Sequence, residues 1–242
     1  MIYFIGAGPG APDLITVRGA ELLRKAGVIV YAGSLVNPGL IDAYASSSCE
    51  LHDSASMTLT EIIAVLAGGH ERGLLTVRLH SGDPALYGAV REQFDALRER
   101  GIPFEVVPGV SSLFAASAAL KTEYMIPGQV QTLVVSRVEG RTPAGNSAST
   151  ALFLSAGMTG KACDELIARG YSPETPAAVV YRASWPDERV IRGTLATLPE
   201  LAEGITKSAI ILAGDFLDDD IHTASRLYDE HFSHEYRDSR VH

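Results

Sequence analysis

Apolar and polar positions follow one another along this chain in two rhythms. Short apolar runs, typical of buried strands, alternate with stretches in which apolar residues recur every third or fourth position, as on one face of a helix. The strand-like runs are residues 1–6, 27–32, 74–80, 103–107, 131–138, 149–155, 177–184, 188–195 and 207–214. The helix-like stretches are residues 16–26, 58–72, 84–100, 111–120, 158–169 and 222–234.

The order of these elements predicts an α/β protein with two α/β domains. In the first half, strands alternate with helices, which predicts a mostly parallel sheet. In the second half, strands follow one another closely around Trp185-Pro186-Asp187, a predicted hairpin turn, which indicates a mixed sheet. Proline and glycine in residues 121–128 suggest a boundary after a helix, giving domains 1–120 and 121–242 with a polar tail. The polar loop 139–148 is long enough for a lid or a substrate contact.

The stretch 78–90 combines a strand end, a tight loop and an expected helix. Gly82 lets the backbone approach a ligand closely. Asp83 suits a helix N-cap, and Pro84 suits the first helical position. Ser81 and Gly82 are therefore expected at the carboxyl end of a strand, where ligands bind in open α/β sheets. An ordinary, well-capped turn between strand and helix is the alternative.

Two further strand ends carry similar turns, at residues 6–13 and 107–112. If the strands are parallel neighbours, all three turns lie along one edge of a sheet and form a binding crevice. The first turn formally matches the dinucleotide pattern G-x-G-x-x-G/A. However, Pro9 and Pro12 stiffen it, and the strand at 28–31 lacks the following acid that a dinucleotide ribose needs. We therefore expect no NAD site.

Together these three blocks resemble the tetrapyrrole (precorrin) methylase family of S-adenosylmethionine-dependent enzymes. The resemblance covers nearly the whole chain and rests on the segments 6–10, 82–84 and 107–109. Two finer segments, 31–36 and 79–89, are similar to its branch of precorrin-4 C11-methyltransferases of cobalamin biosynthesis. Uroporphyrinogen methylases would be expected to carry a Gly-Gly-Asp-Pro-Phe type of loop instead.

The resemblance implies a cofactor cleft between the two domains, S-adenosyl-L-methionine as methyl donor, S-adenosyl-L-homocysteine as product, and a homodimer. It implies C-methylation of a corrin precursor, with precorrin-4 at C11 favoured. The alternatives are uroporphyrinogen III, another precorrin or a macromolecule as substrate, and a nucleotide-binding regulatory domain without turnover. The residues implied in cofactor binding are Pro9, Ser81, Gly82, Asp83, Leu86, Tyr87, Ser111, Ser112, Met158, Ala183, Ala213 and Gly214.

Methyl transfer from a sulfonium is a direct displacement, so it needs positioning and exclusion of water rather than a nucleophilic side chain. Asp83 near the sulfonium would aid binding more than rate, because transfer neutralises the sulfur. No residue is assigned to catalysis. His80, beside the expected site, is a candidate proton relay or a structural residue. Candidate partners for substrate carboxylates, or plain surface charges, are Arg78, Arg137, Arg141 and Arg182.

Composition narrows the choice of partner. The chain has 242 residues, 46% of them hydrophobic, and a formal net charge of −9. That charge argues against nucleic acid, which needs a basic face. The tetrapyrrole that the resemblance implies is also an anion, so its carboxylates would be met by local arginines rather than by the net charge. No apolar run approaches the roughly 20 residues that cross a bilayer, and no signal peptide is evident. Two isolated cysteines form no metal spacing, so we expect no metal site and a cytoplasmic location.

Overall fold

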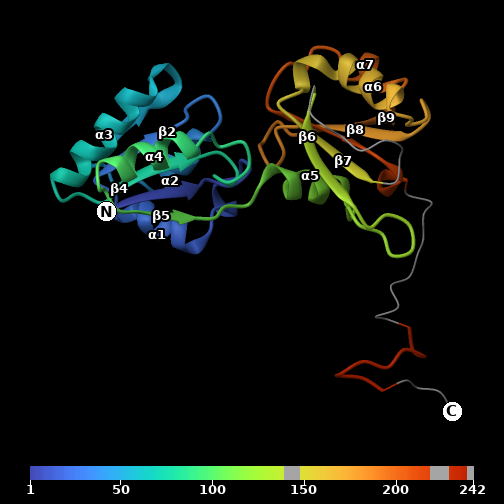
Figure 1. Ribbon diagram of the computed structural model, residues 1–242, viewed down its shortest axis with the longest axis horizontal. Coiled ribbons are helices and arrows are strands. Elements are labelled where there is room, and N and C mark those ends of the chain that lie inside the picture. Colours follow the sequence, from blue (N-terminus) through green and yellow to red (C-terminus); the bar gives the residue numbers. More distant parts are fainter. Residues whose placement is uncertain (139–147, 219–228, 239–242) are drawn as a thin grey trace. The chain divides into compact units, whose positions relative to one another are not determined.

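The computed structural model describes residues 1–138, 148–218 and 229–238. The chain divides into two compact units (Figure 1). The first unit comprises Met1–Ala116 together with Arg182–Glu188, and the second comprises Ser117–Tyr181 together with Arg189–His242. A short segment from the second half of the sequence therefore packs with the first unit. Each unit is described by itself.

The first unit contains a five-stranded parallel sheet of order β3-β2-β4-β1-β5. Because all strands run the same way, their carboxyl ends share one edge. Gly6 at the end of β1 pairs with His80 at the end of β4, and Ile5 pairs with Val107 at the end of β5. The strands are β1 (Ile2–Gly6), β2 (Val28–Tyr31), β3 (Glu50–Asp53), β4 (Thr76–His80) and β5 (Phe104–Val107).

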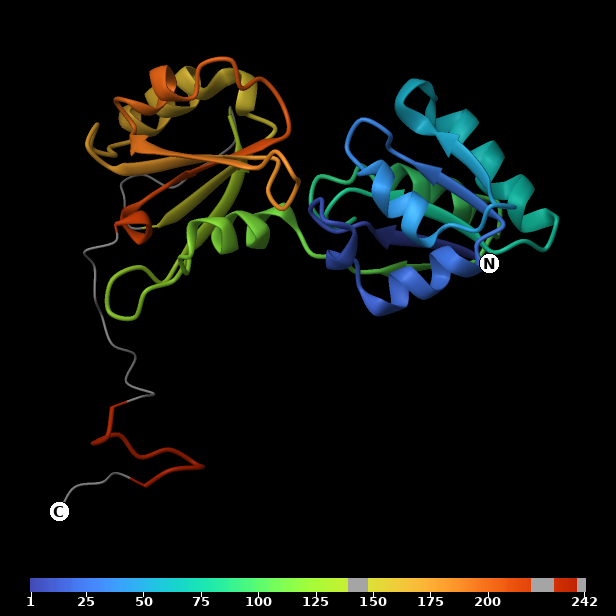
Figure 2. The ribbon, with the colours of Figure 1, turned by 180° about the vertical axis from the view of Figure 1, so that it is seen from behind.

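Helices cover both faces of this sheet (Figures 1 and 2). One face packs Ile5, Ile29 and Leu79 against α1 and α2, and the other packs Phe4 and Val30 against α3 and α4. Local sequence starts several of these helices: Thr16 caps α1, Asn37 caps α2, and Thr58 with Glu61 forms a capping box on α3. The helices on these faces are α1 (Val17–Lys25), α2 (Pro38–Tyr44), α3 (Leu59–Glu71) and α4 (Arg91–Glu99), with 3-10 turns at Pro12–Leu14 and Ser54–Ser56. A fifth helix, α5 (Ser112–Leu120), begins in the first unit and ends in the second.

The second unit contains a mixed sheet of order β6-β7-β10-β8-β9, in which β6 and β7 are parallel and the other pairs are antiparallel. Its core joins the strands to α6 and α7 through Val179, Ile211, Leu166 and Leu198. The elements are β6 (Leu133–Arg137), β7 (Ser149–Phe153), β8 (Pro176–Tyr181), β9 (Arg189–Thr194), β10 (Ala209–Ala213), α6 (Thr159–Ala168) and α7 (Leu198–Leu201), with 3-10 turns at Ala156–Met158 and Asp215–Leu217. The predicted fold class of a parallel and a mixed sheet is confirmed.

The structure corrects several predicted elements. The predicted helix 84–100 begins only at Arg91. The strand β3 and the helices α2 and α7 were missed: β3 is an exposed edge strand of sequence Glu-Leu-His-Asp, without apolar alternation, and α7 is a single turn.

The predicted tail helix 222–234 falls partly outside the described residues, and residues 229–234 within them are not helical. The loop 139–148 lies, except for Ala148, outside the described residues. Among helices of the described segments, none is long and apolar enough to cross a membrane.

Candidate functional site

Three loops meet where β1, β4 and β5 end. The backbone of Gly82 donates to Gly8 O at 2.8 Å, and Gly8 donates back to Gly82 O at 3.3 Å. A Cβ on Gly109 would lie 2.2 Å from Gly82 O, and one on Gly6 would lie 2.5 Å from Gly109 Cα. We call Gly6, Gly8, Gly82 and Gly109 the glycine junction. It confirms that the three turns lie together on one edge of the sheet.

Asp83 ties two of these loops together. Its Oδ2 accepts the backbone N–H of Gly109 at 2.8 Å, and its Oδ1 accepts that of Ala85, also at 2.8 Å. The predicted role of Asp83 as a helix N-cap, with Pro84 in the first helical position, is wrong because no helix begins there. Instead, Asp83 accepts the N–H of Gly109 from the neighbouring loop 107–112, a contact that the residues around Asp83 cannot predict. Asp83 therefore links the loop after β4 to the loop after β5.

The remainder of this loop is strained. Tyr87 has φ +56° and Ala89 has φ +47°, in the left-handed region that side chains other than glycine rarely adopt. Each such residue costs on the order of 1–3 kcal/mol and persists only where the surroundings enforce it. Tyr87 is 43% exposed. The strained loop therefore places a partly exposed aromatic residue after the carboxyl end of β4.

The turn 182–188 closes over the first glycine-rich loop. Trp185 Nε1 donates to Pro9 O at 3.0 Å, and Ser184 Oγ accepts the N–H of Ala11 at 3.0 Å. A Cβ on Gly10 would lie 2.1 Å from Trp185 Cδ1, so Gly10 is required by this packing. The hairpin turn predicted around Trp185 is confirmed, but its contact with the glycine loop was missed. Its only sequence signal is the single tryptophan of the chain.

The remaining predicted cofactor residues divide between the units. In the first, Ser81 and Leu86 are partly exposed, Ser111 is buried and accepts the N–H of Leu113, and Ala183 is buried. In the second, Met158 is 41% exposed after β7, whereas Ala213 is buried at the end of β10 and Gly214 has φ +138°. The structure brings together Pro9, Ser81, Gly82, Asp83, Leu86, Tyr87, Ser111, Ser112 and Ala183 within the first unit, and Met158, Ala213 and Gly214 within the second.

His80 does not suit proton transfer at neutral pH. Burial, with a smaller contribution from the charge of Arg78, lowers the pKa of His80 to about 3. Its ring stacks on Phe4 with centroids 5.9 Å apart, and its Nε2 is buried without a hydrogen-bond partner. The imidazole is therefore neutral at neutral pH, and a structural role fits better than a relay.

The candidate substrate arginines have different environments. Arg78 is buried and bonds to protein groups, so it does not meet a substrate carboxylate. Arg182 pairs with Asp187 at 2.8 Å and lies over the ring of Trp185 at 3.9 Å from its centroid. Arg137 is exposed at the end of β6, and Arg141 lies outside the described residues.

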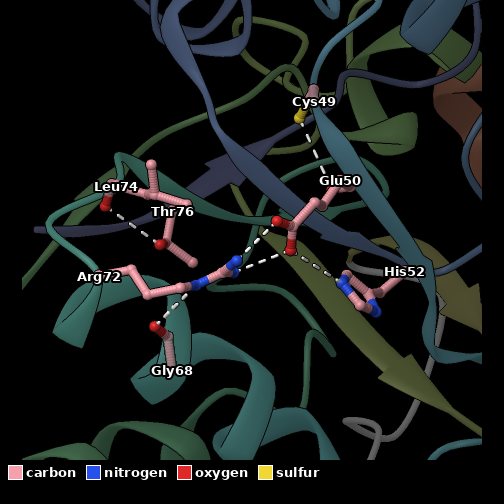
Figure 3. A network of polar contacts seen from close by, with 7 residues as sticks. All are labelled: Cys49, Glu50, His52, Gly68, Arg72, Leu74 and Thr76. Carbon is pink, nitrogen blue, oxygen red and sulfur yellow. Dashed lines mark hydrogen bonds and ion pairs between the residues drawn. The ribbon is translucent and has the colours of Figure 1, made fainter.

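A second polar cluster lies at the opposite end of the first sheet, where β3 begins (Figure 3). Arg72 forms two hydrogen bonds with the Glu50 carboxylate, at 2.6 and 2.8 Å, and its Nε donates to Gly68 O. His52 Nε2 lies 4.0 Å from Glu50. A groove of about 460 Å³ adjoins this cluster and is lined by Glu50, His52, Val65, Gly68, Glu71 and Arg72. Within the described segments, no group of His, Cys, Asp and Glu side chains is arranged to hold a metal ion.

The family model described as Tetrapyrrole (Corrin/Porphyrin) Methylases matches residues 1–199. The chain belongs to this family. It is a methyltransferase, and the glycine junction and Asp83 lie within the matched residues.

Individual members of the tetrapyrrole methylases are similar along almost the whole chain. It is 47% identical over 250 residues to a cobalt-precorrin-4 C(11)-methyltransferase of Methanocaldococcus jannaschii, covering 98% of this chain and 96% of the relative. A solved cobalt precorrin-4 methyltransferase, a cobalamin biosynthetic enzyme, has a TM-score of 0.84 and 44% identity, covering 90% of this chain and 95% of that one. A uroporphyrin-III C-methyl transferase from Thermus thermophilus, solved with S-adenosyl homocysteine, has a TM-score of 0.75 and 28% identity, covering 92% and 95%.

The glycine junction suits the methyl donor of this family. At Gly6 and Gly109 neighbouring backbone leaves no room for a side chain, so this edge of the sheet consists of main-chain atoms. Ser81 directly precedes Gly82, and Tyr87 follows it in the same loop; these two residues supply a hydroxyl and an aromatic ring, and both are at least partly exposed. Main-chain groups, a hydroxyl and a ring match the polar and flat parts of an adenosyl group.

Proposed function

We propose that this methyltransferase transfers a methyl group from S-adenosyl-L-methionine to C11 of precorrin-4 in cobalamin biosynthesis, releasing S-adenosyl-L-homocysteine. The observation that carries the proposal is the glycine junction at the carboxyl edge of the first sheet. It occurs in a chain 47% identical, over 98% of its length, to a relative named for C11 methylation of cobalt-precorrin-4. The carboxyl edge is where open α/β sheets bind ligands.

The bound donor supplies a methyl group on a positively charged sulfur. The chain's own contribution is to orient the reactants and exclude water, which in the best cases lowers a barrier by roughly 7–11 kcal/mol. No side-chain nucleophile is needed. We assign donor binding to Pro9, Ser81, Gly82, Asp83, Leu86, Tyr87, Ser111, Ser112, Met158, Ala183, Ala213 and Gly214.

Asp83 serves binding rather than the chemical step. Its carboxylate brings negative charge to the junction while its two oxygens hold the N–H groups of Gly109 and Ala85. Attraction to the donor's positive sulfur fades as the methyl group leaves, so it stabilises the bound donor more than the transition state. The same side chain thus fixes the loops and favours a cationic ligand.

The partner in this proposal is an anionic tetrapyrrole, and neither nucleic acid nor a membrane is involved. The net charge of −9 disfavours a polyanionic macromolecule. We further propose a homodimer that works in the cytoplasm. Light scattering should then give twice the monomer mass of 25.7 kDa, and a monomer at all concentrations would contradict the dimer.

The decisive experiment incubates the protein with isotopically labelled S-adenosylmethionine and one tetrapyrrole at a time, followed by carbon NMR of the product. Precorrin-4, cobalt-precorrin-4 and uroporphyrinogen III form the three arms. We expect label at C11 of a precorrin-4 form. Preferred methylation of uroporphyrinogen III would overturn the substrate assignment.

Calorimetric titration tests the donor separately. S-Adenosylhomocysteine should bind with measurable heat, and NAD should not, because β2 is followed by Ala32 and Gly33 rather than by an acid for the ribose. Comparable affinity for NAD would reject the donor assignment.

A further inference from the structure

A chain of buried polar groups connects β4 to the strained loop. Arg78, on β4, is 6% exposed, and Gln93, in the first turn of α4, is 4% exposed. Arg78 Nε donates to Gln93 Oε1 at 3.2 Å, and Gln93 Nε2 donates to Ala89 O at 2.9 Å. Arg78 Nη1 also donates to Val30 O on β2 at 3.2 Å. The side chains of Arg78 and Gln93 therefore link strands β2 and β4 to the end of the loop 81–90.

Arg78 determines which way the Gln93 amide faces. A guanidinium only donates hydrogen bonds, so only the carbonyl oxygen of Gln93 can satisfy it. The amide nitrogen must then point to the carbonyl of Ala89. The reversed amide would set two donors against each other at Arg78 and two acceptors against each other at Ala89.

The hydrogen bond from Gln93 to Ala89 O supports the strained part of the loop. Ala89 and Tyr87 both have positive φ, and such backbone persists only when neighbouring groups impose it. Residues assigned above to donor binding, from Ser81 to Tyr87, occupy the same loop. Neither Arg78 nor Gln93 needs to touch the donor to influence it.

We propose that Arg78 and Gln93 are positioning residues that hold the loop 81–90 in the conformation that binds the methyl donor. This inference rests on the proposed function only for the identity of the donor. The positioning itself is a property of the loop.

The variant Gln93→Glu tests the proposal. Its carboxylate keeps an acceptor for Arg78 and adds an ionic partner, so the core contact survives. It offers no N–H to Ala89 O. Losing one such bond should weaken S-adenosylhomocysteine binding roughly two- to tenfold in calorimetry. Hydrogen exchange of backbone amides in residues 85–90 should become faster, while exchange in β4 stays unchanged.

The matched control is Gln131→Glu. Gln131 is exposed, and its Nε2 also donates to a backbone carbonyl, that of Ile126 at 3.3 Å. The same chemical change there should leave donor affinity and loop exchange at the parental values. A loss equal to that of Gln93→Glu would show a general effect of added charge and overturn the proposal.

The variant Ala89→Gly provides a rescue. Glycine adopts positive φ without a side-chain clash, so the loop should depend less on Gln93. In this background Gln93→Glu should lose less affinity and accelerate exchange less. Parental affinity and exchange in Gln93→Glu alone would overturn the proposal. So would unfolding of Gln93→Glu in both backgrounds, because Gln93 would then serve the core. If the parent protein binds S-adenosylhomocysteine but methylates no precorrin-4, only the substrate assignment of the proposed function is rejected.

Discussion

The two ends of the first sheet are built in opposite ways. At the carboxyl end, the glycine junction is held by backbone hydrogen bonds, packed glycines and the carboxylate of Asp83. At the amino end, the cluster of Glu50, His52 and Arg72 has more charge, but its side chains are between 35% and 51% exposed (Figure 3). Exposed ion pairs contribute little because water and salt screen them. A concentration of charge therefore does not by itself indicate a binding edge, and the donor site proposed above lies where backbone packs without side chains.

The largest expected difference between the two ends comes from adding one methyl group. Gly109→Ala places a Cβ 2.2 Å from Gly82 O, and overpacking of this kind costs about 1–3 kcal/mol. Unfolding temperature and S-adenosylhomocysteine affinity should both fall. Gly68→Ala, beside Arg72 in α3, meets no atom within 4 Å and should stabilise the helix by roughly 0.5–1 kcal/mol. Equal tolerance at both sites in calorimetric melting would contradict the comparison.

The next effect is a pH dependence from His80 at the carboxyl end. Its pKa is about 3 in the folded protein against 6.5 in the unfolded chain. Below pH 6.5 the unfolded chain takes up a proton that the folded protein does not, so acid favours unfolding down to about pH 3. This contributes up to about 1.4 kcal/mol for each pH unit.

The substitution His80→Phe should remove that contribution and retain stacking on Phe4. Urea unfolding at pH 7 and pH 4.5 measures it, because carboxylate protonation is common to both proteins. The variant should lose less stability in acid than the parent. Parallel pH profiles would show that His80 is protonated in the folded state after all.

A smaller effect is expected from Asp83→Asn. The amide keeps one oxygen but turns an NH₂ group toward either Gly109 N or Ala85 N, so one hydrogen bond of about 1 kcal/mol is lost. The KM for the donor should rise more than kcat falls. A large loss of kcat with unchanged donor affinity would place Asp83 in the chemical step.

The smallest effect belongs to the amino end. Hydrogen bonds from Arg72 lower the pKa of the Glu50 carboxylate, which lies at the surface. The pair therefore stabilises the fold at neutral pH, and that contribution fades as pH falls through the lowered pKa. Glu50→Gln should shift the melting temperature slightly, less still in high salt, and leave S-adenosylhomocysteine affinity unchanged. A change in that affinity would mean that the two ends of the sheet are coupled.

The sequence by itself determined most elements, the parallel and mixed sheets, the family, and the placing of three loops on one edge. Hydrophobic periodicity and capping residues are local, so Thr16 before α1 or the apolar β4 can be interpreted without the fold. Only the tertiary structure decided how the loop 81–90 is held. The backbone N–H of Gly109, in a distant loop, donates a hydrogen bond to the carboxylate of Asp83, which local sequence patterns would assign to capping a helix. Arg78 and Gln93 are likewise held by burial between a strand and a helix. Trp185 is held by Pro9, 176 residues earlier in the chain, and no local sequence pattern records such a contact.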